Sequence, residues 1–351
     1  MTSQALNQSI VSLDIARLGP YLAERIPGFG RLVSADKFAG GQSNPTFLLT
    51  TDSGRYVLRR KPPGQLLKSA HAVDREYRVM AALADTPVPV PRMHHLCEDE
   101  SVIGSVFFVM EFLEGRIFWE AVLPEIGPED RRAVYDAMNA TLAALHDVDP
   151  QAVGLGDFGR PGSYYERQIA RWSEQYRATE TTPLPDMDAL IAWLQENQPA
   201  DDGMVSLVHG DFRHDNLMFA KDAPRVIALL DWELATLGHP FADLAYQCMQ
   251  WRLPSKGAFR GMGDVDRVAL GLPVEEEYVA SYCERRGLPG IPHWSFYLAF
   301  AFFRLAGILQ GVYKRALDGN ASDPERGVRM GETVPLLARL AIEEIEGRAL
   351  R

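Results

Sequence analysis

The order of apolar and polar positions divides the chain into a strand-rich part and a helix-rich part. The strand-rich part opens with an amphipathic segment at residues 12–26 that predicts a helix, and a second helix is predicted at 69–84. Short apolar runs bounded by Gly, Asp, Ser and Pro predict five strands, at Leu32–Phe38, Thr46–Thr51, Tyr56–Arg60, His94–Cys97 and Val106–Leu113.

Beyond Gly115 the apolar spacing becomes helical. The predicted helices cover residues 128–147, 163–178, 186–197, 240–251, 274–286, 293–317 and 328–347. A β-rich island at 205–233 lies between them. We therefore expect an α+β protein, with residues 1–112 forming a five-stranded sheet together with the helix at 69–84, and residues 113–351 forming a mainly helical part.

Composition narrows the classes of function. The chain has 351 residues, 46% of them hydrophobic, and a formal net charge of −11. An acidic chain is a poor candidate for binding nucleic acid or an anionic membrane, so a polyanionic ligand needs a local basic cluster. The apolar stretch Trp294–Val312 contains Arg304 and Gln310, which favours a buried helix over a membrane span.

Cysteine usage argues against a structural metal or a disulfide framework. The three cysteines, Cys97, Cys248 and Cys283, are odd in number and far apart, and no CxxC pair occurs. The first residues lack a basic segment followed by an apolar run, so we expect no signal peptide. A cytoplasmic location fits these features best.

The segment LVHGDFRHDNLMF, residues 207–219, carries the strongest chemical signal. Asp211 and Asn216 lie on one loop between apolar runs, and Asp231 ends the next apolar run, VIALLDWE. Magnesium prefers hard oxygen ligands together with substrate phosphates. Asn216 and Asp231 could supply such oxygens, while Asp211 would remain free to face a substrate hydroxyl.

The spacing H-G-D-x-x-x-x-N followed by a strand-terminal Asp resembles the aminoglycoside phosphotransferase and choline kinase family, which has the protein-kinase-like fold of two lobes. The resemblance implies that Asp211 is catalytic and that Arg213 contacts the transferred phosphate. It gives His209 a structural role in the loop. Asp243, in GHPFADLA, is expected to brace the loop by accepting backbone hydrogen bonds. Glu233 departs from the protein-kinase pattern, which has glycine there.

Upstream residues match the expected nucleotide site in order. Gly41, Ser43 and Asn44 lie between two predicted strands, where glycine lets the backbone approach phosphates. In the resemblance, Arg59 takes the place of the phosphate-binding lysine and would pair with Glu76. Lys61, on the same strand face, is the alternative to Arg59.

The run Phe108–Phe112 resembles the hinge that binds the adenine edge. Backbone groups near Glu111 and Leu113 would contact the base, and Met110 would line its pocket. A buried central strand would look similar. The cofactor that the resemblance implies is Mg²⁺ with ATP, and GTP remains open.

Several stretches, among them GGQSNPTFLL, YVLRRKPPG and FRLAGILQGVYKRA, resemble one branch of the family: the kinase-like domain of acyl-CoA dehydrogenase family members 10 and 11 and its free-standing bacterial relatives. This branch implies phosphorylation of a hydroxyacyl-CoA or a related hydroxy acid. The alternative acceptors are an aminoglycoside, choline or a sugar. The aromatic residues of the helical part, such as Trp172, Tyr246, Trp251 and Trp294, could contact the acceptor or simply form core.

Two rival functions stay open on the sequence alone. A cluster of His209, Asp211, His214 and Asp215 could belong to a metal-dependent phosphohydrolase, which would need further ligands elsewhere. A nucleotide-binding pseudokinase regulator is the rival of another class, although Asp211, Asn216 and Asp231 are all present. The sequence leaves the oligomeric state and the pathway open.

Overall fold

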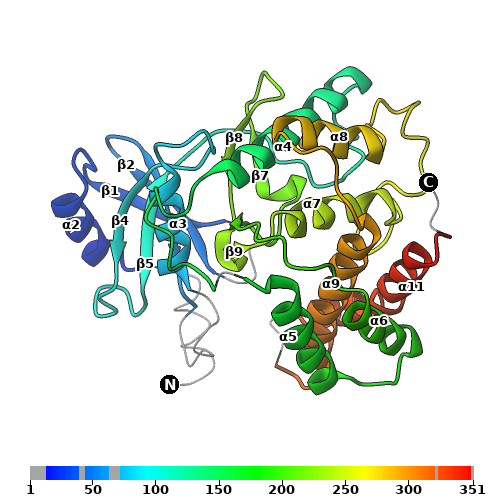
Figure 1. Ribbon diagram of the computed structural model, residues 1–351. Helices are drawn as coiled ribbons and strands as arrows, with labels where there is room; N and C mark the ends of the chain where they lie inside the picture. Colours follow the sequence, from blue (N-terminus) through cyan, green and yellow to red (C-terminus); the bar gives the residue numbers. More distant parts are fainter. Residues whose placement is uncertain (1–12, 39–43, 63–71, 161, 321–322, 349–351) are drawn as a thin grey trace. The chain divides into compact units, whose positions relative to one another are not determined.

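The computed structural model describes residues 13–38, 44–62, 72–160, 162–320 and 323–348. The chain divides into two compact units, whose elements are labelled in Figure 1. The first unit comprises Met1–Gly115 together with Ile227–Leu234, and the second comprises Arg116–Val226 together with Ala235–Arg351.

This division differs from the expected one in two ways. The boundary expected after Phe112 falls after Gly115, and Ile227–Leu234 belongs to the first unit rather than to the helical one. The reason is bonding between residues that are far apart in the sequence. The Leu229 N–H donates to the Pro89 carbonyl oxygen at 2.8 Å, and the Asp231 carboxylate is ion-paired with Arg59, so the middle of this segment is bonded to residues of the first unit.

The first unit is built on an antiparallel sheet with the strand order β1-β2-β3-β5-β4. Its strands are β1 (Leu32–Lys37), β2 (Thr46–Thr51), β3 (Arg55–Arg60), β4 (Met93–Cys97) and β5 (Phe107–Glu111). Two helices accompany them, α2 (Ile15–Arg25) and α3 (Val73–Leu83). All five predicted strands are confirmed, with ends that differ from the prediction by at most two residues. The predicted helix start at residue 69 lies outside the described residues.

The two faces of this sheet have different partners. Side chains alternate between the faces of a strand. Phe47, Leu58 and Val109 belong to one apolar cluster that also contains Leu18 and Leu22 of α2. Their neighbours along the strands therefore point to the opposite face, where α3 packs against β4 and β5. This second face carries Arg59 of β3, which lies beside Glu76 of α3.

The second unit is mainly helical. Its helices are α4 (Pro128–Asp147), α5 (Tyr164–Thr179), α6 (Pro185–Glu196), α7 (Phe241–Cys248), α8 (Glu275–Arg285), α9 (Trp294–Leu317), α10 (Pro324–Gly331) and α11 (Val334–Ile345). The short strands of the predicted island are β6 (Ser206–Val208), β7 (Leu217–Phe219), β8 (Val226–Leu229) and β9 (Thr236–Gly238), of which β8 belongs to the first unit from Ile227 on. β6 pairs antiparallel with β9, so the island extends five residues beyond its predicted end.

Helix α9 forms the centre of this unit. It packs against α5, α7, α10 and α11. Among the described residues it is the one helix long and apolar enough to cross a membrane, but 78% of its most apolar window is buried within the protein. The prediction of a buried helix at 293–317 is confirmed, and Arg304 and Gln310 are themselves buried.

Two predicted helices have different limits. The helix expected at 240–251 ends at Cys248 and continues as a 3₁₀ turn, Met249–Trp251. The helix expected at 328–347 is two helices, α10 and α11. Pro335 lies in the first turn of α11 and has no N–H to continue a helix from α10. The Asp323 side chain accepts from the Arg326 N–H and begins α10 four residues earlier than predicted.

Candidate active site

The first unit places a buried charged cluster on the α3 face of its sheet. Arg59, near the end of β3, lies 3.0 Å from the Glu76 carboxylate of α3. The Asn44 amide donates to the other Glu76 oxygen at 2.7 Å. The pairing of Arg59 with Glu76 that the sequence predicted is therefore present, and it fixes Asn44 beside it.

Asp231 completes this cluster. It follows β8, and its carboxylate accepts from the Arg59 guanidinium at 2.8 Å. Its φ of 65° lies in the left-handed region, which non-glycine residues adopt at a cost of about 1–3 kcal/mol. Strained backbone of this kind is concentrated at functional sites. The conformation turns the carboxylate toward Arg59 directly after the strand.

The charge balance of the cluster affects Glu76. The pKa of Glu76 is raised to about 7, mainly by burial; the Arg59 guanidinium acts to lower this pKa, and the carboxylates of Asp231 and Glu233 act to raise it. One guanidinium thus faces three carboxylates. This excess of negative charge would suit a cation bound nearby.

Lys61 has a different partner from Arg59. Its ammonium lies 3.2 Å from the Asp74 carboxylate in the first turn of α3. Lys61 remains partly exposed, whereas Arg59 is mostly buried. Of the two basic residues, Arg59 is the one integrated with Asn44, Glu76 and Asp231.

The remaining residues predicted at the nucleotide site are partly described. Gly41 and Ser43 lie outside the described residues. Met110 is buried on β5, opposite Val57 of β3. The Glu111 N–H donates to the Arg92 carbonyl oxygen at 2.8 Å, so this N–H is already engaged. The predicted contacts to a base would therefore involve the Glu111 carbonyl and the Leu113 backbone rather than this N–H.

In the second unit, the loop after β6 is held by buried hydrogen bonds to Asp243. The backbone N–H groups of His209 and Gly210 donate to the Asp243 carboxylate at 2.6 and 2.8 Å. Gly210 has a φ of 85°, a conformation that glycine adopts without strain. His209 accepts from the Asp211 N–H through Nδ1 at 3.2 Å. The expected bracing contacts of Asp243 are therefore present.

Asp211 and Asn216 meet on this loop. The Asn216 amide nitrogen donates to the Asp211 carboxylate at 2.9 Å and to its backbone carbonyl at 2.8 Å. Because its nitrogen is used in this way, the amide oxygen of Asn216 is directed away from Asp211 and could bind a metal. Arg213 lies 3.5 Å from the Asp211 carboxylate and 2.6 Å from Asp215.

The surroundings of Asp211 keep it ionised. Burial acts to raise the pKa of Asp211, but Arg213 and a hydrogen bond from Tyr246 outweigh it and lower the pKa below its ordinary value. A carboxylate that is ionised at neutral pH can accept a proton from a hydroxyl.

Sequence reasoning missed two supports of this loop. Arg304 of α9 donates to the Gly210 carbonyl oxygen at 2.7 Å, and its guanidinium lies over the rings of Trp172 and Tyr246. His146 of α4 contacts the Asp243 carboxylate at 3.4 Å. A charged residue inside the apolar run of α9 was a usable signal, because a buried arginine requires polar partners.

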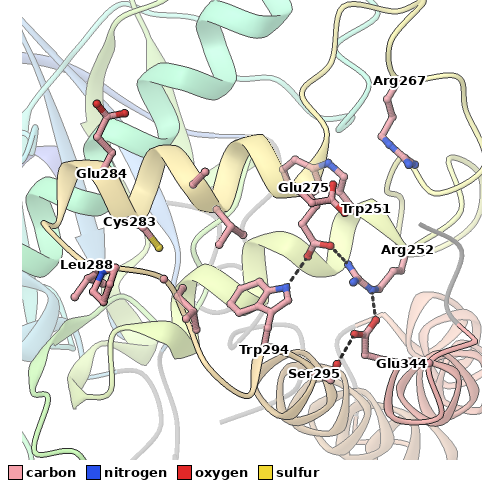
Figure 2. Close-up of a pocket in the computed structure, with 17 residues that line it drawn as sticks. Trp251, Arg252, Arg267, Glu275, Cys283, Glu284, Leu288, Trp294, Ser295 and Glu344 are labelled. Atoms are coloured by element: carbon pink, nitrogen blue, oxygen red, sulfur yellow. Dashed lines mark hydrogen bonds and ion pairs between the residues drawn. The ribbon is translucent and has the colours of Figure 1, made fainter.

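The aromatic candidates for acceptor binding separate into three environments. Tyr246 reaches Asp211, and Trp172 packs on Arg304. Trp251 and Trp294 line a cavity of about 690 Å³ that Figure 2 shows. There Arg252 lies between Glu275 and Glu344, at 2.8 and 2.6 Å, and the Trp294 indole donates to Glu275. These buried ion pairs join α8 to α11 and the segment after α7.

No ion is needed to explain the histidines near the loop. His209 is bonded to the Asp211 N–H, and His239 lies 3.3 Å from Asp202. Within the described residues no group of three or more His, Cys, Asp and Glu is placed to hold a metal. Asn216 and Asp231 remain the two oxygen donors that the sequence analysis predicted as metal ligands.

Comparison with known proteins identifies the family. Residues 34–273 match the sequence model of the family described as "Phosphotransferase enzyme family". Mouse acyl-CoA dehydrogenase family member 10 is 49% identical over 306 residues, which cover 87% of this chain and 28% of that protein. The chain thus spans less than a third of that relative's length.

Solved structures agree. A candidate aminoglycoside phosphotransferase from Ralstonia eutropha is 48% identical, with a TM-score of 0.88 and coverage of 97% of this chain and all of that one. Spectinomycin phosphotransferase, solved with ADP and spectinomycin, is 13% identical with a TM-score of 0.63, covers 93% and 98% of the two chains and shows the fold alone. The expected protein-kinase-like fold is confirmed, and the chain belongs to the phosphotransferase enzyme family as a small-molecule kinase.

Proposed function

We propose that this protein transfers the terminal phosphate of ATP, or of GTP, to a hydroxyl group of a small molecule with the help of Mg²⁺. The observation that carries the proposal is the loop of the second unit, in which an ionised Asp211 is hydrogen-bonded to Asn216 and braced by Asp243 and Arg304. In phosphoryl transfer, positioning and charge stabilisation provide most of the catalysis.

The nucleotide-binding roles belong to the first unit. Arg59 would hold phosphate oxygens with its fork of N–H groups, oriented by Glu76 and Asn44. Lys61 is the weaker candidate because it pairs with Asp74. The base would contact the Glu111 carbonyl and the Leu113 N–H beside Met110. Gly41 and Ser43 would lie over the phosphates.

Asn216 and Asp231 would hold the magnesium ion. An amide oxygen and a carboxylate are hard ligands, and Mg²⁺ commonly keeps water and substrate phosphates as its other ligands. When bound, the ion neutralises charge on the transferring phosphate. The excess of carboxylates around Arg59 supports a cation at this place.

Asp211 would orient the acceptor hydroxyl and take its proton. The oxygen–phosphorus bond to the nucleoside diphosphate breaks as the acceptor oxygen bonds to phosphorus, and the hydroxyl proton passes to the Asp211 carboxylate. Arg213 would contact the transferred phosphate, which requires it to exchange its present ion pair with Asp215 for the phosphate.

The acceptor we favour is a hydroxyacyl-CoA or a related hydroxy acid. The similarity to mouse acyl-CoA dehydrogenase family member 10 supports this choice. The Ralstonia eutropha protein supports the alternative, an aminoglycoside, and choline or a sugar is possible by family. The free, buried Cys97, Cys248 and Cys283 support a reducing, cytoplasmic location.

The test is a nucleotide-consumption screen across hydroxyacyl-CoAs, hydroxy acids, aminoglycosides, choline and sugars. We expect turnover with one hydroxylated class and a phosphorylated product by mass spectrometry. Asp211→Asn should lower kcat by roughly 10²–10⁴-fold, the usual scale for a general base, while nucleotide affinity barely changes. Nucleotide binding without turnover on any acceptor would instead indicate the pseudokinase regulator, and full turnover in Asp211→Asn would contradict the role of the base.

A further inference from the structure

A basic groove opens in the second unit beside helix α10. It has a volume of about 580 Å³. Its lining includes four cations, Lys256, Arg260, Arg326 and Arg329, one carboxylate, Glu332, and the ring of Phe259. On a chain with a net charge of −11, such a concentration of cations is a local exception. A groove of this kind attracts anions.

The wall that carries Lys256 and Arg260 is a folded loop. The N–H groups of Gly261 and Gly263 donate to the carbonyl oxygens of Pro254 and Leu253, both at 2.8 Å. A Cβ added at Gly261 or Gly263 would approach backbone atoms to 2.4 and 2.6 Å, so glycine is required at both positions for this close packing. The loop therefore holds its basic residues at a fixed place next to α10.

Part of the groove's charge is uncompensated. Arg260 is ion-paired with Glu120 at 2.5 Å, and Arg329 has a loose contact of 3.9 Å with Glu325. In the part of the chain that the structure describes, Lys256 and Arg326 have no carboxylate within 4.0 Å, although Lys256 acts on Asp264 at longer range. These two cations are available to an incoming anion.

The groove adjoins the loop that carries Asp211. The guanidinium of Arg213 lies 5.2 Å from the centre of the Phe259 ring, in the geometry of a cation–π contact. Arg213 in turn lies 3.5 Å from the Asp211 carboxylate. The groove and the proposed base are therefore separated by two side chains of the same unit. A ligand anchored in the groove could extend a hydroxyl toward Asp211.

We propose that the basic groove binds the phosphate groups of an acceptor that carries a phosphorylated handle, such as the adenosine phosphates of a coenzyme A thioester. This inference rests on the proposed function and adds to it the residues that select the acceptor. Lys256 and Arg326 contact the phosphates, and the arginine forks of Arg260 and Arg329 flank them. The groove disfavours a polycationic acceptor such as an aminoglycoside.

Binding is measured by calorimetry with coenzyme A as the probe. A saturating non-hydrolysable ATP analogue occupies the nucleotide site, so that the adenosine of the probe cannot enter it. We expect the variant Lys256→Glu/Arg326→Glu to raise the Kd for coenzyme A at least about tenfold, the scale of losing charge-assisted hydrogen bonds. Adenosine 3′,5′-bisphosphate should compete, whereas pantetheine should bind equally to both proteins.

The matched control is Arg339→Glu, because Arg339 is an exposed arginine of α11 outside the groove. It should leave the Kd for coenzyme A unchanged, and both variants should keep the unfolding temperature of the parent protein. An equal Kd for coenzyme A in the parent and the groove variant overturns the proposal. The proposal is also overturned if inorganic phosphate competes with coenzyme A as strongly as adenosine 3′,5′-bisphosphate does. Such competition would show that the groove binds free phosphate.

Kinetics separate this inference from the function on which it rests. With a hydroxyacyl-CoA, the groove variant should raise KM about tenfold with little change in kcat, and the matching hydroxyacyl-pantetheine should show no such difference. Phosphate transfer to an acceptor without any binding of coenzyme A would contradict the proposed role of the groove and would still support the kinase function. Binding of coenzyme A in the groove without transfer to any hydroxyl would support the groove as a ligand site and contradict the kinase.

Discussion

At the scale of single residues, Glu76 links the stability of the folded protein to pH. Its pKa is about 7 in the folded protein and returns to about 4.3 in the unfolded chain. Between these values the folded state holds a proton that the unfolded state has lost, so Glu76 makes the free energy of unfolding fall as pH rises through this window. The protonated form also weakens the pairing with Arg59.

We expect Glu76→Gln to remove this contribution, because a glutamine cannot titrate and can still accept from Asn44. Urea denaturation between pH 4.5 and 8 should show a smaller loss of stability with rising pH in the variant than in the parent protein. Glu24→Gln, an exposed change on α2, should follow the parent curve. Parallel curves for parent and Glu76→Gln would show that the residue does not titrate in this range.

At the scale of elements, the loop between β6 and β7 depends on the left-handed conformation of Gly210. Alanine at a φ of 85° costs about 1–3 kcal/mol. Gly104 provides a matched control, since its φ is 81° and an added Cβ would meet open space. Gly210→Ala and Gly104→Ala should lose similar stability in denaturant, but only Gly210→Ala should lower kcat, because it displaces Asp211. Equal kcat values in the two variants would contradict this role of the loop.

Helix α9 supports the same loop through Arg304. Arg304→Met removes the donor to the buried Gly210 carbonyl, a charge-assisted hydrogen bond of about 1.5–3 kcal/mol. We expect a loss of stability of this size and a lower kcat. Arg315→Met, an exposed arginine further along α9, should change neither quantity. If both variants denature at the same urea concentration, the contact contributes nothing measurable.

At the scale of the whole molecule, local patterns predicted the elements well and their limits less well. The strand and helix periods identified all five strands of the first sheet because its faces have clear apolar and polar sides. These periods failed to predict features that depend on bonds between residues far apart in the sequence. Ile227–Leu234 joins the first unit through Leu229 and Asp231, and no local pattern carries that information.

The candidate site shows the same contrast. Asp211 and Asn216 could be found from the sequence because their fixed spacing places them on one loop. Glu76 could be found because it lies on the helix that follows the strand carrying Arg59. Arg304 and His146 reach Gly210 and Asp243 across more than ninety residues, so only the folded chain reveals them. The groove beside α10 was equally hidden, since its cations come from two separate segments.

Asn216 and Asp231 must bind one ion if the proposed chemistry is right, and a double-mutant cycle tests this requirement. Asp231→Asn and Asn216→Ala should each weaken the binding of an ATP analogue in the presence of Mg²⁺. Because they would remove ligands of the same ion, the double variant should lose less affinity than the two single losses together, with an interaction energy of about 0.5–3 kcal/mol. Asp222→Asn, an exposed carboxylate after β7, should leave affinity unchanged in the same titration. Strictly additive losses would mean that Asn216 and Asp231 act on separate groups, and the shared magnesium site would then be wrong.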